Sequence, residues 1–339
     1  MSQHTENAQS TMSVKSSMKT TLICVLALSS IIGGILVPFL PIGPVTLTLI
    51  TQGTFTAIMA TSVGLLIHQC GLISFGHATF FGLGAYITAL LLKNTSLHFT
   101  LIVALAIGLP TLFGFLMALV VVRQTGVAFS MLTLAVAQVF HEVILKWRNL
   151  AGGDDGMSVQ LPTTLLGFNS RIFQTASTMF SISWCLLTAI LLGLYLFNQS
   201  RWGRLVFAIR DNEERVRFLG HDTLLLRAFV FSLSSAIGSL GGVLFLLYNA
   251  YVSPELLHWT YSGFALVMAI VGGAEFVLGP ALGALVFLFT KDAMGEITEH
   301  WQSIMGVTLI VITVWRPAGL AGIAETQFKK IKWGRRDFQ

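Results

Sequence analysis

The sequence predicts an all-α polytopic membrane protein of about ten helical segments, and three observations carry that prediction. Of the 339 residues, 54% are hydrophobic and only 10% are charged, against roughly 25% charged in a soluble domain. No Lys, Arg, Asp or Glu occurs in the 73 residues from Thr20 to Leu92. Ten of the 35 formally charged residues fall instead between Arg201 and Arg227, too many to lie inside a bilayer.

Apolar runs long enough to cross a membrane recur along the chain, since the hydrocarbon core takes about 20 helical residues. A link of four residues, His68 to Gly71, joins the second run to the third, so we expect these two helices to be antiparallel neighbours. The seven runs are Thr20–Leu40, Val45–Ile67, Leu72–Leu92, Phe99–Val122, Val127–Leu145, Thr178–Phe197 and Leu224–Tyr248.

The region from Ser262 to Phe289 fits either one long helix or two short half-helices that meet near Gly272–Pro280. A last apolar run goes from Trp301 to Trp315. With half-helices, both termini are cytoplasmic, and 15 Lys and Arg lie inside against five outside. We favour the half-helices because membrane proteins concentrate Lys and Arg on the cytoplasmic side. Such a break lines a transport path or allows close helix packing.

The two ends of the chain differ in composition from the region between them. Residues 1–19 are polar, which predicts a disordered cytoplasmic segment. The apolar run after Lys19 is too long for a signal-peptide core, so we expect a retained first span. The membrane domain is expected over residues 20–322, with a cytoplasmic loop at 201–223, followed by a basic cytoplasmic tail at 323–339. The stretch from Arg201 to Arg227 and the tail from Lys329 to Arg336 hold 11 of the 20 basic residues, which explains the net charge of +5 without nucleic acid.

The charged loop has the local signals of a short helix. Asp211 is placed to cap its N-terminus, and Glu214 follows three residues later in a capping-box spacing. Gly220 is placed to end the helix, which predicts about eight helical residues, Asn212–Leu219. A helix this short is marginal alone in water, so we expect it to need a partner surface.

Glu214, followed six residues later by Gly220, resembles the Glu-Ala-Ala-x-x-x-Gly loop of ABC importer permeases, although Arg215 and Val216 replace the two alanines. Longer blocks resemble the branched-chain amino-acid permeases, and are most similar to the M-type subunit of the high-affinity Leu/Ile/Val importer. Ala274-Glu275 departs from that pattern, because the family usually has a further Gly there. The blocks occur in order between Val45 and Gly322: Gly71–Ala78, Gly82–Tyr86, Gly152–Gly156, Gly203–Glu213, Ser253-Pro254, Gly272-Gly273, Gly279–Ala284 and Arg316–Leu320.

This resemblance implies a non-catalytic permease subunit that moves branched-chain amino acids across a bacterial inner membrane. The implied partners are a homologous permease in a heterodimer, two ATPases that bind ATP and Mg, and a periplasmic substrate-binding protein. No cofactor is expected on this chain. In the implied mechanism the ATPases close on ATP, move the coupling helices and rock the spans around a central path. The residues expected to couple to the ATPases are Arg210, Asp211, Glu213, Glu214, Arg217 and Gly220.

Two further groups of residues are candidates for function. Ser74, His77, Gly272 and Gly273 are expected on the substrate path, because an ionisable residue inside a membrane is a functional candidate. Packing between helices is the alternative role for His77, and the glycines of its block are expected to allow close helix contact. Asp154 and Asp155, on the predicted outer face, either dock the binding protein or form a turn.

Several classes of protein are disfavoured by what the sequence lacks. It has no Gly-Lys dipeptide and hence no ATP-binding P-loop, and it has no hydrolase motif. Its acids and three cysteines lack metal-ligand spacing, so we expect no metal. A permease for urea or short amides remains an alternative. An ion-coupled secondary transporter is a second one, although the first four spans carry no charged residue.

Overall fold

The computed structural model describes residues 27–41, 43–162, 164–165, 168–295, 300–315 and 319–322. An apolar helix, Ala27–Phe39, ends in a 3-10 turn, η1 (Val37–Phe39). Within the described residues, five helices are long and apolar enough to cross a membrane. They are α2 (Pro44–Cys70), α4 (Phe99–Val121), α5 (Gly126–Lys146), α8 (Ala176–Gln199) and α11 (Thr223–Asn249). A sixth long helix is α3 (His77–Asn94).

Shorter elements lie in the connections between these helices. β1 pairs antiparallel with β4, with Met157 opposite Val252, and β2 pairs antiparallel with β3. Between α5 and α8 lie α6 (Arg148–Ala151), η2 (Gly153–Asp155), β1 (Met157–Ser158), β2 (Thr164–Leu165), β3 (Phe168–Asn169) and α7 (Arg171–Gln174). Between α8 and α11 lie α9 (Arg201–Asp211) and α10 (Glu213–Phe218). After α11 come β4 (Tyr251–Val252), η3 (Pro254–Leu257), α12 (Trp259–Gly272), α13 (Gly279–Gly295) and α14 (Trp301–Trp315).

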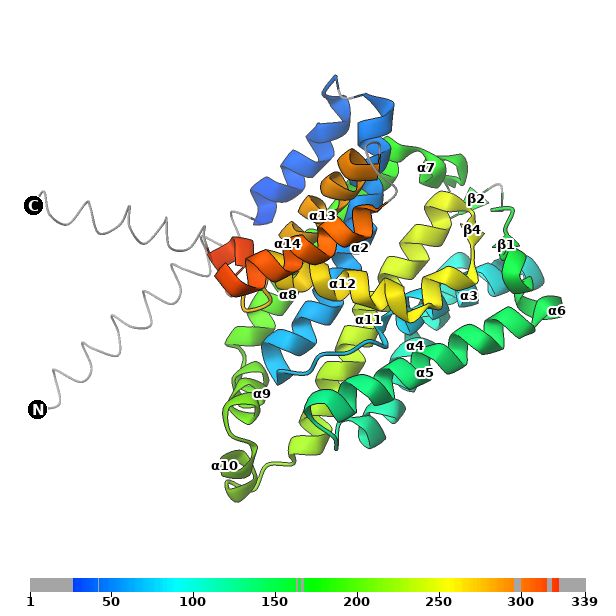
Figure 1. Ribbon diagram of the computed structural model, residues 1–339. Helices are drawn as coiled ribbons and strands as arrows, with labels where there is room; N and C mark the ends of the chain where they lie inside the picture. The colour runs from blue at the N-terminus through cyan, green and yellow to red at the C-terminus, as the bar shows by residue number, and fades with distance from the viewer. Residues whose placement is uncertain are drawn as a thin grey trace, which may run out of the picture.

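The centre of the molecule is built on α2 and α11. α11 packs against α2, α3 and α4, and α2 also contacts α8 and α13. Aromatic side chains fill the space between them; the rings of Phe80 and Phe231, both fully buried, meet edge to face with centroids 5.6 Å apart. α11 runs from the α10 end of the molecule to the β4 end (Figure 1). By contrast, most residues of α4, α5 and α8 are not fully buried within the bundle, as is typical of helices that face lipid or a partner.

The third predicted span begins later than expected. α3 starts at His77 rather than Leu72, because Gly71 takes a left-handed conformation (φ 65°) that ends α2 and the next residues are irregular. Irregular backbone at membrane depth must find its hydrogen bonds within the protein. α5 supplies them: Thr133 Oγ1 accepts from the N–H of Phe75 (3.2 Å), and Ser130 Oγ donates to the carbonyl of Ile73 (2.6 Å).

α2 and α3 are in contact, but α2 is not the main neighbour of α3. α11, much later in the chain, is the helix that packs most extensively on α3. Glycines allow the approach: a Cβ on Gly84 would overlap the carbonyl of Ser239, and a Cβ on Gly242 would overlap that of Phe81. The predicted close-packing role is confirmed at Gly84, where α11 is the partner; Gly76 packs instead on Thr133 of α5 and Gly82 on Leu257 of η3.

The break near Gly272–Pro280 is present. α12 has 14 residues and ends at Gly272, and α13 begins at Gly279. α13 is longer than the predicted half-helix, with 17 residues that reach Gly295. α9 is a helix that the loop reading did not predict. The expected disordered segment at 1–19 and basic tail at 323–339 lie outside the described residues.

Candidate functional site

α10 is a short helix with a complete cap at each end. Asn212, not the predicted Asp211, caps the N-terminus: its side chain accepts from the N–H of Arg215 at 2.9 Å. Asp211 is instead the last residue of α9, a helix that the sequence signals did not reveal. The predicted stop at Gly220 is confirmed. Gly220 takes φ 85°, and its N–H donates to the carbonyl of Arg217 (3.0 Å).

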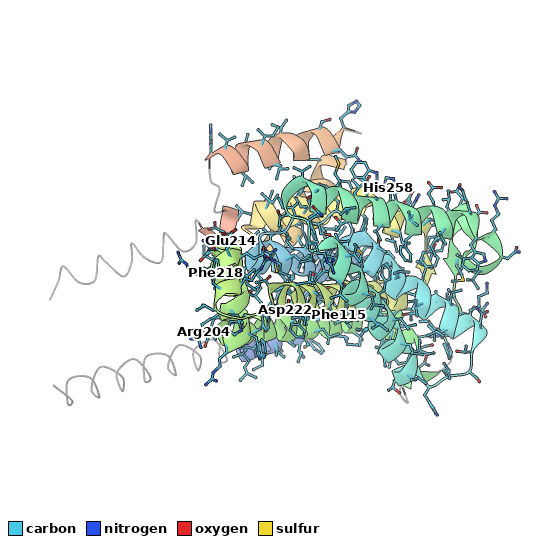
Figure 2. All side chains as sticks on the ribbon, turned by 90° about the horizontal axis from the view of Figure 1, so that it is seen from below. Phe115, Arg204, Glu214, Phe218, Asp222 and His258 are labelled. Atoms are coloured by element: carbon cyan, nitrogen blue, oxygen red, sulfur yellow. The ribbon has the colours of Figure 1, made fainter. Side chains whose placement is uncertain are left out.

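The exposed side of α10 is apolar at its tip and charged around it. Val216 is the buried residue of the helix, whereas Phe218 is 89% exposed and Leu219 is 72% exposed. Glu214 and Phe218 stand at the rim of the molecule (Figure 2). Glu214, Arg215 and Arg217 are also exposed. A large aromatic side chain held in the open on a capped helix is typical of a surface that a protein partner covers.

Glu213 fastens α10 to the helix that follows it. Its Oε2 accepts from Arg227 of α11 at 2.8 Å, and its Oε1 accepts from Thr223 at 2.9 Å and from Arg217 at 3.0 Å. Partial burial opposes the charged form of this carboxyl group. The hydrogen bond from Thr223 and the two arginines outweigh that effect, and hold the pKa of Glu213 below its usual value.

Arg210 fastens α9 to the end of α2. Its guanidinium donates to the carbonyl of His68 (2.8 Å) and lies over the ring of Phe207, 5.7 Å from the centroid. α9 is amphipathic, with Val206 and Ile209 buried against the bundle. Together α9 and α10 form one unit that packs against the ends of α8 and α11. The predicted coupling residues, Arg210 to Gly220, therefore all lie on this unit, although they do not all face outward.

Ser74 and His77 lie in a closed hydrogen-bond network that joins three helices. His77 Nε2 lies 2.7 Å from Ser234 Oγ of α11, and Nδ1 lies 2.9 Å from Ser74 Oγ. Ser234 Oγ donates its only hydrogen to the carbonyl of Ser62 on α2 (2.5 Å), so it accepts from His77. This assigns the ring proton to Nε2. All four side chains are fully buried, so the path role of Ser74 and His77 stays a prediction.

Gly272 and Gly273 lie where three backbone segments meet. A Cβ on Gly272 would overlap the carbonyl of Gly279, and a Cβ on Gly283 would overlap that of Met268. Gly319, φ 63°, approaches Gly273 in the same way. Side chains are excluded here by contact between backbones, which gives these glycines a packing role. Their predicted place on the substrate path is untested.

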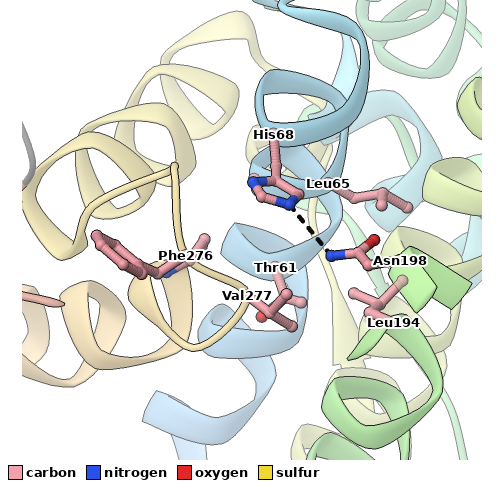
Figure 3. Close-up of a pocket in the computed structure, with 9 residues that line it drawn as sticks. Thr61, Leu65, His68, Leu194, Asn198, Phe276 and Val277 are labelled. Carbon is pink, nitrogen blue, oxygen red and sulfur yellow. Dashed lines mark hydrogen bonds between the residues drawn. The ribbon is translucent and has the colours of Figure 1, made fainter. Parts of the chain in front are cut away.

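Glu275, the departure from the family pattern, borders a cavity of about 700 Å³ between α2, α8 and the α12–α13 connection. His68 and Asn198 also border it, and His68 Nε2 is hydrogen-bonded to Asn198 Nδ2 at 3.1 Å. Figure 3 shows this bond in a smaller pocket that the same two residues line. The Oδ1 of Asn198 accepts in turn from Gln69. The sequence reading missed this polar cluster because its members lie on two helices far apart in the chain.

Asp154 and Asp155 form a tight turn at the opposite end of the molecule from α10. Both are exposed, in the 3-10 turn η2, and Tyr251 donates its hydroxyl hydrogen to the carbonyl of Asp155 at 2.8 Å. Gly152, Gly153 and Gly156 all take positive φ. The turn is thus anchored by backbone contacts that leave both carboxylates in solvent. In the described part of the chain, no three His, Cys, Asp or Glu residues gather as metal ligands would.

An integral membrane permease is the class that this bundle of long apolar helices indicates. The family model for the permease component of the branched-chain amino acid transport system matches residues 45–314, and the chain belongs to that family. No solved structure matches the chain.

Relatives of the same type occur in bacteria and archaea. The high-affinity branched-chain amino acid transport system permease protein LivM of Escherichia coli K12 is 25% identical over 304 residues, which covers 84% of this chain and 72% of the relative. A probable LivM protein of Methanocaldococcus jannaschii is 28% identical over 65% of this chain and 68% of its own. A ribose import permease protein, RbsC of Haemophilus influenzae, matches 45% of this chain at 22% identity, covering 51% of that protein. The predicted M-type resemblance is confirmed.

Proposed function

We propose that this chain is one membrane subunit of an ATP-driven importer, and that α10 is its coupling helix, the element seated on the ATPase. The observation that carries the proposal is the exposure of Phe218 and Leu219 on a helix that is capped at both ends and bonded to α11. The contacts of Glu213 with α11 and of Arg210 with α2 would pass a displacement of α10 on to the membrane helices. An apolar tip ringed by charge fits a groove on a soluble partner.

The cargo that the family favours is leucine, isoleucine or valine, carried across the bacterial inner membrane. In the proposed assembly this chain pairs with a homologous permease, binds two ATPase subunits and receives cargo from a periplasmic binding protein. ATP and Mg bind the ATPases, and this chain supplies helices and the coupling contact. Urea or a short amide is the alternative cargo, since the membrane helices encode cargo weakly.

Replacing Phe218 by Asp tests the docking contact. Burial of one Phe side chain contributes about 2 kcal/mol, so the variant should bind the ATPase roughly thirtyfold more weakly. Co-purification of the ATPase with the detergent-extracted permease measures this. The matched control is Phe39→Asp, because Phe39 is 82% exposed in η1 and lies far from α10 in the chain. Equal ATPase recovery with both variants would remove the docking role of α10.

The proposed topology puts α10 and both termini in the cytoplasm. A reporter that fluoresces only in the cytoplasm, fused after Arg336, should fluoresce, and the same reporter in the Asp154–Asp155 turn should not. Fluorescence from the turn, or none from the tail, would reverse or break this topology. The charge distribution, 15 Lys and Arg inside against five outside, is what supports it.

A further inference from the structure

The carboxylate of Glu213 joins two helices, α10 and α11, that are connected along the chain by the turn around Gly220. Arg217 lies on α10 itself, one helical turn from Glu213, and is 68% exposed as a side chain. Thr223 and Arg227 lie on α11, beyond the turn around Gly220. Asp222 caps α11 by accepting from the N–H groups of Leu224 and Leu225, so the start of α11 is itself rigid. The contacts of Glu213 with α11 therefore close a loop between two capped helices.

Arg227 differs from the other arginines of this region in its burial. Its side chain is 8% exposed, and its Nη1 lies 2.8 Å from Glu213 Oε2, while its Nε has no hydrogen-bond partner in the described structure. Of the other arginines of this region, Arg217 also bonds Glu213, and Arg210 donates to the carbonyl of His68. A buried guanidinium without its carboxylate is strongly unfavourable. Glu213 and Arg227 are therefore expected to stay together as the complex moves.

α11 carries this attachment directly into the buried core. Ser234 follows Arg227 by seven residues, which is about two helical turns and places both on one face of α11. Ser234 is bonded to His77 of α3 and to the carbonyl of Ser62 on α2. The chain of contacts from α10 to the core is thus Glu213, Arg227, α11, Ser234 and His77. Every link is a hydrogen bond or a continuous helix.

We infer that Arg227 is a positioning residue for coupling: by holding Glu213, it makes α10 and α11 move as one body, so that ATPase motion reaches the Ser234–His77 junction. The inference deepens the proposed function of α10 and depends on it. Arg227 is too buried to touch the ATPase, so its effect would be on transmission and not on docking. Removing the pair should leave α10 docked but free to pivot at Gly220.

Arg227→Gln in the assembled complex tests this inference. The full complex, with the binding protein loaded in turn with leucine, isoleucine and valine, is reconstituted in liposomes. The readouts are ATPase co-purification, cargo-stimulated over basal hydrolysis, and cargo moved per ATP. We expect normal co-purification and a roughly fivefold or greater loss of stimulation, the range of a typical coupling free energy. Arg227→Lys should restore part of it. Unchanged stimulation by Arg227→Gln would overturn the inference.

A double-mutant cycle shows whether Arg227 acts through Glu213. Glu213→Gln and the double variant should each lose about as much stimulation as Arg227→Gln alone, and additive losses would overturn the inference. Thr223→Val, an isosteric change that removes one bond to Glu213, should lose less in the same direction. If Arg227→Gln does not fold, wild-type stimulation in Thr223→Val overturns the inference instead.

The control for lost positive charge is Arg123→Gln. Arg123 follows α4, and its side chain donates to the carbonyl of Leu119 near the end of that helix, far along the chain from α10 and α11, so stimulation should not change. Failure of the proposed function has a different signature: the wild-type chain would not retain the ATPase, whatever residue stands at position 227. Retention with normal stimulation in Arg227→Gln would refute only the positioning role.

Discussion

The helix α10 and the break between α12 and α13 are both short interruptions among long helices, and they are held in opposite ways. Side chains hold α10: Asn212 caps it, and Glu213 bonds it to Arg227 and Thr223. Backbone contact holds the break, where Gly272, Gly279 and Gly283 have no room for a Cβ. Polar bonds can be broken one at a time and rebuilt, whereas a backbone contact tolerates no added atom. Under the proposed coupling role, we expect α10 to move as a unit while the break stays close-packed.

The largest expected effect comes from adding one methyl group at the break. Gly283→Ala places a Cβ against the carbonyl of Met268, and overpacking of this kind costs about 1–3 kcal/mol or more. The midpoint of thermal unfolding in detergent should fall, with a lower yield of folded protein. Gly263→Ala is the matched control, because nothing lies within 4 Å of the Cβ it adds in α12. Equal midpoints for both variants would show that the break is loose.

A smaller effect is expected at the hinge of α10. Gly220 has open space around it but φ 85°, so a substitution strains the backbone without a clash. Gly220→Val should lose about 1–2 kcal/mol of turn stability and lower cargo-stimulated ATPase activity. Gly220→Asn should retain most of the activity, since Asn tolerates this conformation. Wild-type coupling in the Val variant would mean that the turn at Gly220 does not matter for the role of α10.

The smallest effect is expected at the opposite end of the molecule. Asp154→Asn together with Asp155→Asn removes two exposed charges from a turn that backbone contacts hold, so folding should not change. If the turn receives the binding protein, association should slow by no more than about tenfold, with a shallower salt dependence. Association rates measured at two ionic strengths check this. Unchanged rates at both would leave these residues as turn formers.

The comparison also explains what could be predicted from sequence. Charge and turn residues located α10 and its end at Gly220, because these signals act within a few residues. The cap was misassigned to Asp211 because α9 continues through that residue, and α9 has only 11 residues with mixed polarity. The attachment of Glu213 was not predicted, because Arg227 had been counted as one more cytoplasmic charge, although it is buried.

In the membrane region, too, local signals could be predicted from the sequence but long-range contacts could not. Glycines at positions such as 84 and 272 predict close contact between helices, but the sequence does not identify the segment that makes the contact. The pairing of α3 with α11 is a long-range contact that depends on packing of the whole bundle. The late start of α3 has a local cause, Gly71 with positive φ, but it also needed Thr133 from α5 to satisfy the irregular backbone. The cavity beside Glu275 is likewise assembled from separate helices.

The most direct test of the coupling role is a photo-crosslinking side chain placed at Phe218 in the fully assembled complex. At 89% exposure the probe will fit without disturbing the bundle. The account predicts an adduct with the ATPase subunit on illumination, and none from the same probe at Phe39. An assembly that hydrolyses ATP but gives no adduct at 218, or gives equal adducts at both positions, would contradict it.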